Sequence, residues 1–435
     1  MSVEAIGLLG VLILLLLIAL KTPISLAMML VGIVGFSVIV TPGAALSMVS
    51  SELFSNFSSY SLSVIPLFIW MGYTAYYSGV GTRLYNFAYK MVGHKPGGLA
   101  IATQAACGLF GAICGSNTAT AATMGAIALP EMRRYGYNDS LSTASVAAGG
   151  ALGILIPPSV IFIVYGIATE QSIGKLFIAG IIPGILLMLL YMMTIYLMVK
   201  FKPELGPAGP KSSWKERWKA LGDGIFEIII IFSISLGGLF AGWFTPTEAG
   251  AVGAASILTV TVLTKRLTWD GFKKSLTETT RTTAMIMLMV AGAMIFGRFL
   301  AVSRLPAGIA TWAAGLELPS IAVLGIILLI YMLLGSFIDA LALILLTVPI
   351  FYPVVVNILH YDPIWFGVII VLVVAMGVIT PPVGMNVFVI KGVVPDIPVE
   401  TIFKGVWPFV GALLLCIVIL ILFPQLVLVL PELFM

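Results

Sequence analysis

Charged residues are scarce in this sequence. Only 9% of the 435 residues are Asp, Glu, Lys or Arg, against roughly 25% in a soluble domain, whereas 60% are hydrophobic. This composition excludes a soluble globular protein and predicts an all-α polytopic membrane protein embedded in a lipid bilayer. The net charge of +4 is small and is spread along the chain, which argues against nucleic-acid binding.

Cysteine and histidine are also rare, and their scarcity excludes two further classes. The three cysteines lie in apolar surroundings and have neither disulfide nor metal-site spacing. An intramembrane hydrolase would need a nucleophile beside a base, and Ser116 or Ser336 could nominally be that nucleophile. Both histidines, His94 and His360, lie near the ends of predicted helices rather than within the membrane. The chain is therefore not expected to be an enzyme.

Long uncharged runs predict several membrane spans, since about 20 apolar residues cross the hydrocarbon core. The clear runs cover residues 228–247, 318–338, 363–390 and 405–430. Residues 5–20 could be mistaken for a signal peptide, but the segment lacks a basic start, and Lys21 is followed directly by another apolar run. We therefore expect a retained first helix.

One loop is strongly basic. Residues 200–219 carry six Lys or Arg against two Glu, together with several prolines and glycines. The positive-inside rule places this loop in the cytoplasm, and its composition is typical of a linker. We therefore predict a cytoplasmic linker at residues 200–224, followed by scaffold helices at 225–283. Lys265 and Arg266 lie one helical hairpin later, on the same predicted side.

Two Pro-Pro pairs interrupt long uncharged segments. Pro157-Pro158 and Pro381-Pro382 are 224 positions apart, and each follows a similar apolar sequence. Proline lacks an N–H and disrupts the preceding helical turn, so each pair frees carbonyl groups that lipid cannot satisfy. Duplicated broken helices in the two halves of a membrane protein indicate the substrate and ion site of a secondary transporter.

Further landmarks recur in the same order around the two breaks. Gly115-Ser116 matches Gly335-Ser336, a Leu-Pro or Tyr-Pro pair precedes each break, and a Gly-x-x-Pro sequence follows it. Chance recurrence is the alternative in a chain with 45 Gly and 24 Pro, but the ordered series favours duplication. We predict pseudo-symmetric, inverted repeats at residues 65–199 and 284–435, after N-terminal scaffold helices and an interfacial arm in residues 1–64. The expected hairpins cover about 108–130 and 333–353, and the broken helices about 140–169 and 363–390.

Polar residues cluster where each re-entrant hairpin should turn. Ser, Asn and Thr compete for backbone hydrogen bonds, so residues 115–123 suit a hairpin tip buried in protein. The matching tip carries Asp339, and a charge at membrane depth costs roughly 2.5–3.5 kcal/mol unless it is paired or lies on an ion path. A small-residue packing interface with one hydrogen-bonded Asp is the structural alternative.

Hydroxyl, amide, carboxylate and freed carbonyl oxygens are the ligands that a hard cation requires. We therefore predict at least two Na⁺ positions. The first is expected at Gly115, Ser116, Asn117, Thr118 and Pro157, and the second at Gly335, Ser336, Asp339, Thr380, Pro381 and Gly384.

Arg298 is the other costly residue, because it lies in the otherwise uncharged run 285–302. Its planar guanidinium matches a carboxylate or a sulfonate, so it is expected to bind a small organic anion together with Ser116, Asn117 and Asn386. The alternative is a structural ion pair between Arg298 and Asp339.

Four motifs together resemble a known family. They are the sequence Gly-Ser-Asn-Thr-Ala-Thr from Gly115, the Pro-Pro segment from Gly153, Phe-Thr-Pro-Thr-Glu-Ala-Gly from Phe244, and Gly-Val-Ile-Thr-Pro-Pro-Val-Gly from Gly377. In this order they resemble the large membrane subunit of tripartite ATP-independent periplasmic (TRAP) transporters over essentially the whole chain.

The resemblance implies a sodium-driven importer of organic acids in the bacterial inner membrane. It further implies an elevator movement, in which both hairpins and both broken helices slide against a scaffold. The implied partners are a separate small four-helix membrane subunit and a periplasmic substrate-binding protein. A single-component sodium-coupled carrier is the main alternative, and a channel fits closed, oxygen-rich tips less well. Residues 43–63 and 214–218 are expected to be interfacial amphipathic arms or ordinary connecting loops.

Overall fold

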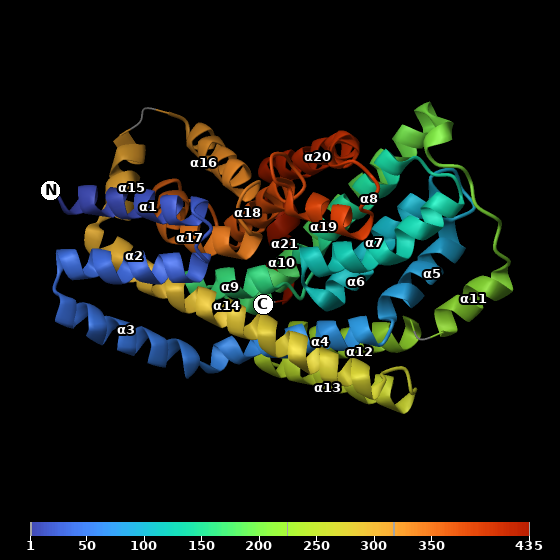
Figure 1. Cartoon of the computed structure of the whole chain (residues 1–435), viewed down its shortest axis with the longest axis horizontal. Coiled ribbons are helices and arrows are strands. Elements are labelled where there is room, and N and C mark those ends of the chain that lie inside the picture. The colour runs from blue at the N-terminus through green and yellow to red at the C-terminus, as the bar shows by residue number, and fades with distance from the viewer. Residues whose placement is uncertain (1, 224, 316–317, 435) are drawn as a thin grey trace.

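The computed structural model describes residues 2–223, 225–315 and 318–434, and within them the chain is helical and contains no strand (Figure 1). Gly224, the last residue of the predicted linker, and the terminal residues Met1 and Met435 lie outside the described part. The first group of helices is α1 (Val3–Ala19), α2 (Ile24–Ile39), α3 (Pro42–Phe57), η1 (Tyr60–Ser63), α4 (Val64–Tyr77) and α5 (Val80–Val92). The next group is α6 (Gly98–Cys114), α7 (Asn117–Arg134), α8 (Asp139–Ala151), η2 (Leu152–Ile154), α9 (Val160–Thr169) and α10 (Ile173–Phe201).

The second half has a similar series of elements. After η3 (Pro203–Leu205) come α11 (Trp214–Gly222), α12 (Ile225–Phe240), α13 (Pro246–Leu263), α14 (Trp269–Ser303) and α15 (Leu305–Gly315). The chain ends with α16 (Ser320–Gly335), α17 (Ala340–Tyr352), η4 (Pro353–Ile358), α18 (Pro363–Gly377), α19 (Met385–Val393), α20 (Val399–Leu422) and α21 (Gln425–Phe434). Five of these described helices are long and apolar enough to cross a membrane, or seven if two bent pairs each count as one span.

Helices α6 and α7 form the first hairpin, and local chemistry sets its turn. Gly115 ends α6 with a φ of +63°, a left-handed conformation that suits glycine. Ser116 then caps α7, because its side chain accepts a hydrogen bond from the Ala119 N–H. The hairpin predicted at about 108–130 therefore has longer arms, but it turns at the polar cluster.

The first broken helix follows directly. Its first half, α8, ends at Ala151, and one 3₁₀ turn leads into the Pro157-Pro158 pair. Ser159 caps the second half, α9, by accepting from the Phe162 N–H. The second half of the chain repeats this order, with α16 and α17 as the hairpin and α18 and α19 on either side of Pro381-Pro382. Both Pro-Pro bonds are cis.

The two halves interlock rather than lying side by side as separate units. The second arm of each hairpin packs against the second half of the other broken helix, so α7 contacts α19 and α17 contacts α9. The helix after each break also crosses over, since α20 packs on α8 and α10 packs on α18. The pairing is reciprocal, and the inverted symmetry inferred from the sequence stays a prediction.

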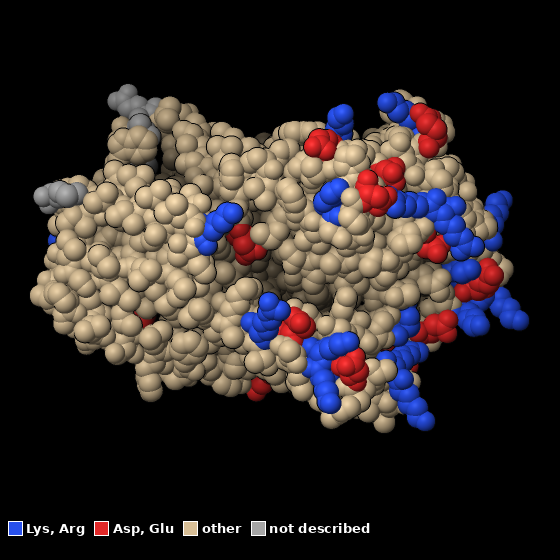
Figure 2. Space-filling model, in the orientation of Figure 1, with Lys and Arg blue, Asp and Glu red and all other residues tan. Residues whose placement is uncertain are grey.

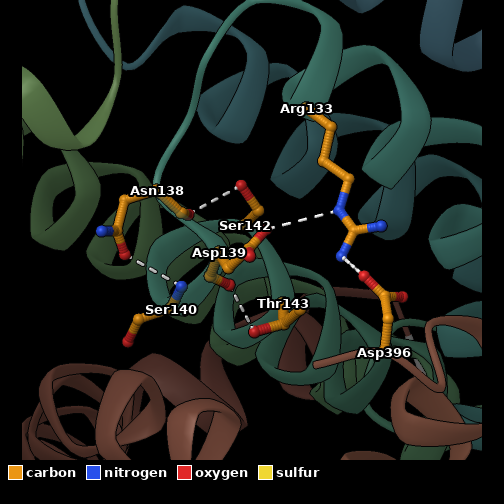
Figure 3. Close-up of polar contacts among 7 residues, drawn as sticks. All are labelled: Arg133, Asn138, Asp139, Ser140, Ser142, Thr143 and Asp396. Carbon is orange, nitrogen blue, oxygen red and sulfur yellow. Dashed lines mark hydrogen bonds and ion pairs between the residues drawn. The ribbon is translucent and has the colours of Figure 1, made fainter. Parts of the chain in front are cut away.

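Polar contacts fasten this interlocked unit at two corresponding places. At the end of α7, Arg133 donates from Nη2 to Asp396 Oδ2 at 2.5 Å, and its Nε lies 3.4 Å from Asp139 Oδ1 (Figure 3). At the end of α17, the Tyr352 hydroxyl accepts a hydrogen bond from Gln171 Nε2 at 3.2 Å. The first contact therefore joins the end of α7 to the connection between α19 and α20. The second joins the end of α17 to the connection between α9 and α10.

The remaining helices form a frame around the interlocked unit. The 35-residue α14 runs along the molecule and packs against α2, α3 and α4 (Figure 1). The segment predicted as an interfacial arm or loop contains α3, which joins the η1–α4 helix at a 52° bend and with it could form one broken span or a re-entrant loop. In the other predicted arm, Trp214 and Trp218 of α11 are exposed.

Charged side chains gather over one end of the molecule. Figure 2 shows both signs concentrated where α5, α8 and α11 lie, and almost none at the opposite end of this face. The predicted cytoplasmic linker lies at the charged end. Three backbone hydrogen bonds hold it there, from Gly97 to Gly206, from Gly209 to Gly93 and from Asn138 to Leu205.

Candidate transport site

A cavity of about 550 Å³ lies where the two hairpin tips approach the frame. One wall is the tip of the first hairpin, including Gly115, Ser116, Asn117 and Thr118, and Asp339 contributes from the tip of the second. The other wall comes from α4 and α14. Figure 2 shows that the face is hollowed near its centre, with charged side chains of both signs around the hollow.

The first hairpin tip is pressed against the first break. A Cβ added at Gly115 would lie 2.7 Å from the Pro158 carbonyl oxygen. A Cβ at Gly153 would lie 2.6 Å from both the Ser116 carbonyl oxygen and Thr120 Oγ1. The structure therefore brings two of the predicted sodium ligands, Gly115 and Ser116, to the first break, and only glycine at positions 115 and 153 permits this approach.

The second tip meets the second break in the same way. The Gly384 N–H donates to the Ser336 carbonyl oxygen at 3.3 Å, and Gly384 has a φ of +59°. A Cβ at Gly377 would lie 2.6 Å from the Gly335 carbonyl carbon and 2.9 Å from its oxygen. Thr380 Oγ1 instead donates to the Met376 carbonyl at 2.5 Å. Four residues predicted for the second sodium position, Gly335, Ser336, Thr380 and Gly384, thus lie together at the second break. Among the described residues of this predicted set, Asp339 alone lines the cavity.

Asp339 caps α17, since its Oδ1 accepts a hydrogen bond from the Leu341 N–H at 3.0 Å. Within the described residues, no Lys, Arg or His lies within 4 Å of its carboxylate. A helix N-terminus carries a partial positive charge that favours this carboxylate. One carboxylate oxygen therefore has a backbone donor and the group has no cationic partner.

Asn117 and Asn386 come from different halves and meet around Gly150. A Cβ at Gly150 would lie 2.9 Å from Asn386 Nδ2 and 3.0 Å from the Asn117 carbonyl oxygen. Asn386 donates from Nδ2 to the Ala147 carbonyl at 3.0 Å, whereas its Oδ1 has no hydrogen-bond partner in the described structure. Asn117 is 6% exposed, lines the cavity, and its Nδ2 has no partner in the described structure either. Buried polar atoms normally have partners, so each of these two atoms can form one further hydrogen bond. Asn386 is fully buried and, unlike Asn117, is not among the described residues that line the cavity.

Arg298 does not lie where the sequence predicts, either at the substrate or beside Asp339. It does not line the cavity and does not pair with Asp339; its Nε donates to Glu52 Oε1 at 2.6 Å. The Glu52 side chain is only 8% exposed, whereas that of Arg298 is 61% exposed. This partner could not be predicted, because Glu52 lies 246 residues away, in the segment expected to be an arm or a loop.

The wall of the cavity formed by α4 and α14 was not predicted from the sequence. It contributes Tyr73, Tyr76, Tyr77, Glu278 and Thr282, and the Tyr73 hydroxyl hydrogen-bonds Thr282 Oγ1 at 3.0 Å. These residues lie outside the duplicated motifs, so the repeat could not reveal them. The described residues contain no group of three or more His, Cys, Asp or Glu that could hold a metal ion.

Comparisons with known proteins identify the family. The family model described as the tripartite ATP-independent periplasmic transporter, DctM component, matches residues 11–426. The C4-dicarboxylate TRAP transporter large permease protein DctM of Pseudomonas aeruginosa is 39% identical, over 88% of this chain and 88% of that protein. The sialic acid TRAP transporter large permease protein SiaM of Vibrio cholerae is 35% identical, over 92% of this chain and 95% of that protein.

Other relatives are named for isethionate and for ectoine transport. A solved structure of the Alcanivorax borkumensis YdaH transporter superposes with a TM-score of 0.62 over 88% of this chain and 90% of that one. At 14% sequence identity, that likeness supports the transporter-like fold alone. The all-α membrane fold and the family expected from the sequence are thus confirmed, and the named relatives are permeases rather than enzymes. The chain belongs to the DctM component family of TRAP transporters, and it is a multi-pass protein of the bacterial inner membrane.

Proposed function

We propose that this chain imports a small organic anion in symport with sodium, using an elevator movement. The observation that supports the proposal is the cavity shared by the two hairpin tips, which Asn117 lines from the first tip and Asp339 from the second. Each tip is also in contact with a helix break. Such places supply the carbonyl and side-chain oxygens that sodium coordination needs.

Two sodium positions are proposed, with Gly115, Ser116, Asn117, Thr118 and Pro157 around the first tip. Gly335, Ser336, Asp339, Thr380, Pro381 and Gly384 would surround the second. Two cations would neutralise an anion in this cavity, since the described residues that line it include no Lys, Arg or His. The N-terminus of α7 would add a partial positive charge. We assign the anion to Ser116, Asn117 and Asn386, and we leave Arg298 out of the site because it pairs with Glu52.

The interlocked helices would form the moving body, and the frame of α14 with α2, α3 and α4 would stay fixed. The long interface between the two borders the cavity, as this movement requires. A separate small four-helix membrane subunit and a periplasmic substrate-binding protein are the proposed partners, following the tripartite family. The substrates named for relatives range from C4-dicarboxylates to ectoine, so similarity alone does not choose one.

The test is uptake by the reconstituted complex in liposomes, with sodium replaced by potassium at a fixed membrane voltage. We expect uptake to require both inward sodium and the binding protein. Equal uptake in potassium would refute sodium coupling. Undiminished uptake without the binding protein would favour a single-component carrier.

A further inference from the structure

The α4–α14 wall of the cavity has a chemistry that sodium and anion binding do not use. Three tyrosines, Tyr73, Tyr76 and Tyr77, lie on it together with Glu278. The Tyr76 and Tyr77 rings meet edge to face, with centroids 4.9 Å apart and an angle of 85°. Aromatic faces beside a carboxylate are the usual recognition surface for an ammonium group.

The Glu278 carboxylate has no ion-pair or side-chain hydrogen-bond partner among the described residues that would give it a purely structural role. Within the described residues it forms neither an ion pair nor a side-chain hydrogen bond, although Arg281 follows it by three positions on α14. Among the described residues, the cavity lining contains two carboxylates, Glu278 and Asp339, and no cationic side chain. A substrate with two negative charges would therefore place one of them against an acidic, aromatic wall.

The opposite wall gives an independent sign of the other end of the ligand. Asn117 lines the cavity and begins α7, a helix of 18 residues, and its buried Nδ2 has no acceptor within the described part of the chain. A donor beside a helix N-terminus favours a negatively charged oxygen. The cavity thus presents groups that favour an anion on the hairpin side and groups that favour a cation on the α4–α14 side.

We propose that the transported substrate is a zwitterion. Its carboxylate lies at Asn117 and the first hairpin tip, and its ammonium or amidinium group lies against Tyr73, Tyr77 and Glu278. This inference rests on the proposed sodium-coupled transport and changes its substrate class, from a simple organic anion to a carboxylate that also carries a positive charge. It makes Glu278 and the tyrosines specificity-determining residues.

Matched ligands test the proposal on the purified full-length chain in detergent with sodium. Glycine betaine is compared with 3,3-dimethylbutyrate, which has the same shape but a carbon in place of the charged nitrogen. A longer pair is γ-trimethylammoniobutyrate and 5,5-dimethylhexanoate. Binding is measured by calorimetry and by the shift in melting temperature. We expect at least one charged member to bind about tenfold or more tightly than its neutral partner.

The Glu278→Gln and Tyr77→Leu variants should reduce that preference to about threefold or less, whereas Glu400→Gln on α20, outside the cavity lining, should preserve it. Equal binding within both pairs, tighter binding of succinate, or no binding of any charged member would overturn the inference. An unchanged preference in Glu278→Gln would overturn the role of that residue. Repeating the titrations in potassium separates the two proposals. Sodium-dependent binding without a preference for the charged ligand would refute only the zwitterion proposal. Zwitterion binding of equal affinity in sodium and potassium would refute only the sodium-coupling proposal.

Discussion

Replacing Gly153 with alanine should weaken sodium binding at the first hairpin tip. The new Cβ would lie 2.6 Å from the Ser116 carbonyl oxygen and Thr120 Oγ1, about 0.8 Å inside ordinary contact distance. The tip and the broken helix must then separate, and overpacking of this kind costs about 1–3 kcal/mol. If the cost falls on the sodium-bound arrangement, sodium affinity decreases by about 5- to 150-fold, because 1.4 kcal/mol corresponds to a factor of ten.

The assay is a sodium titration of the purified chain, followed by melting temperature and by sodium-dependent uptake in liposomes. Gly411→Ala is the matched control, since it lies in α20 and a Cβ there meets nothing within 4 Å. Alanine should leave that helix unchanged or make it slightly more stable. Sodium affinity in Gly153→Ala equal to that of Gly411→Ala would refute the reasoning that this contact forms the site.

Three further predictions concern charged groups. Arg298→Ala should lower the free energy of unfolding by about 1–3 kcal/mol, which is less than for a fully buried ion pair because the Arg298 side chain is 61% exposed. The KM for substrate should stay the same. A melting curve checks the stability, and uptake kinetics check the KM. Asp339→Asn should raise the sodium concentration needed for half-maximal uptake with little loss of stability, because asparagine can still cap α17; an unchanged sodium requirement would count against the second site. The hydrogen bond from Arg133 lowers the pKa of Asp396, so this contact stabilises the fold above the usual carboxyl range and is lost as pH falls through the lowered value. Asp396→Asn should therefore melt below the wild type at pH 7 and approach it below about pH 4, and a constant difference across pH would argue against the ion pair.

The duplicated motifs predicted the hairpin turns and the helix breaks because they encode local backbone chemistry. Gly115, Ser116 and the Pro-Pro pairs determine where helices stop and start, and the structure has its hairpin turns and breaks at those residues. Uncharged runs were less informative about spans. The uncharged run at 228–247 includes the turn between α12 and α13. Because this turn carries no charge before Glu248, the charge pattern could not distinguish it from part of a span.

Tertiary partners could not be predicted in the same way. Arg298 was correctly recognised as costly, but its partner Glu52 depends on how α3 packs against α14, which no local pattern encodes. The tyrosine wall was missed for the same reason. Tyr73 and Glu278 become neighbours of the hairpin tip only through the packing of the frame, about 205 residues apart in the chain.

The reciprocal packing of the two halves has a consequence for synthesis of the protein. The first hairpin is complete when Arg134 has been added, but its packing partner α19 begins only at Met385. At roughly 5–20 residues per second, that interval lasts about 13–50 seconds. During this time the polar tip must wait in or beside the membrane without its native neighbours. We expect the nascent first half to depend on the insertion machinery or a membrane chaperone until about the last eighth of the chain emerges.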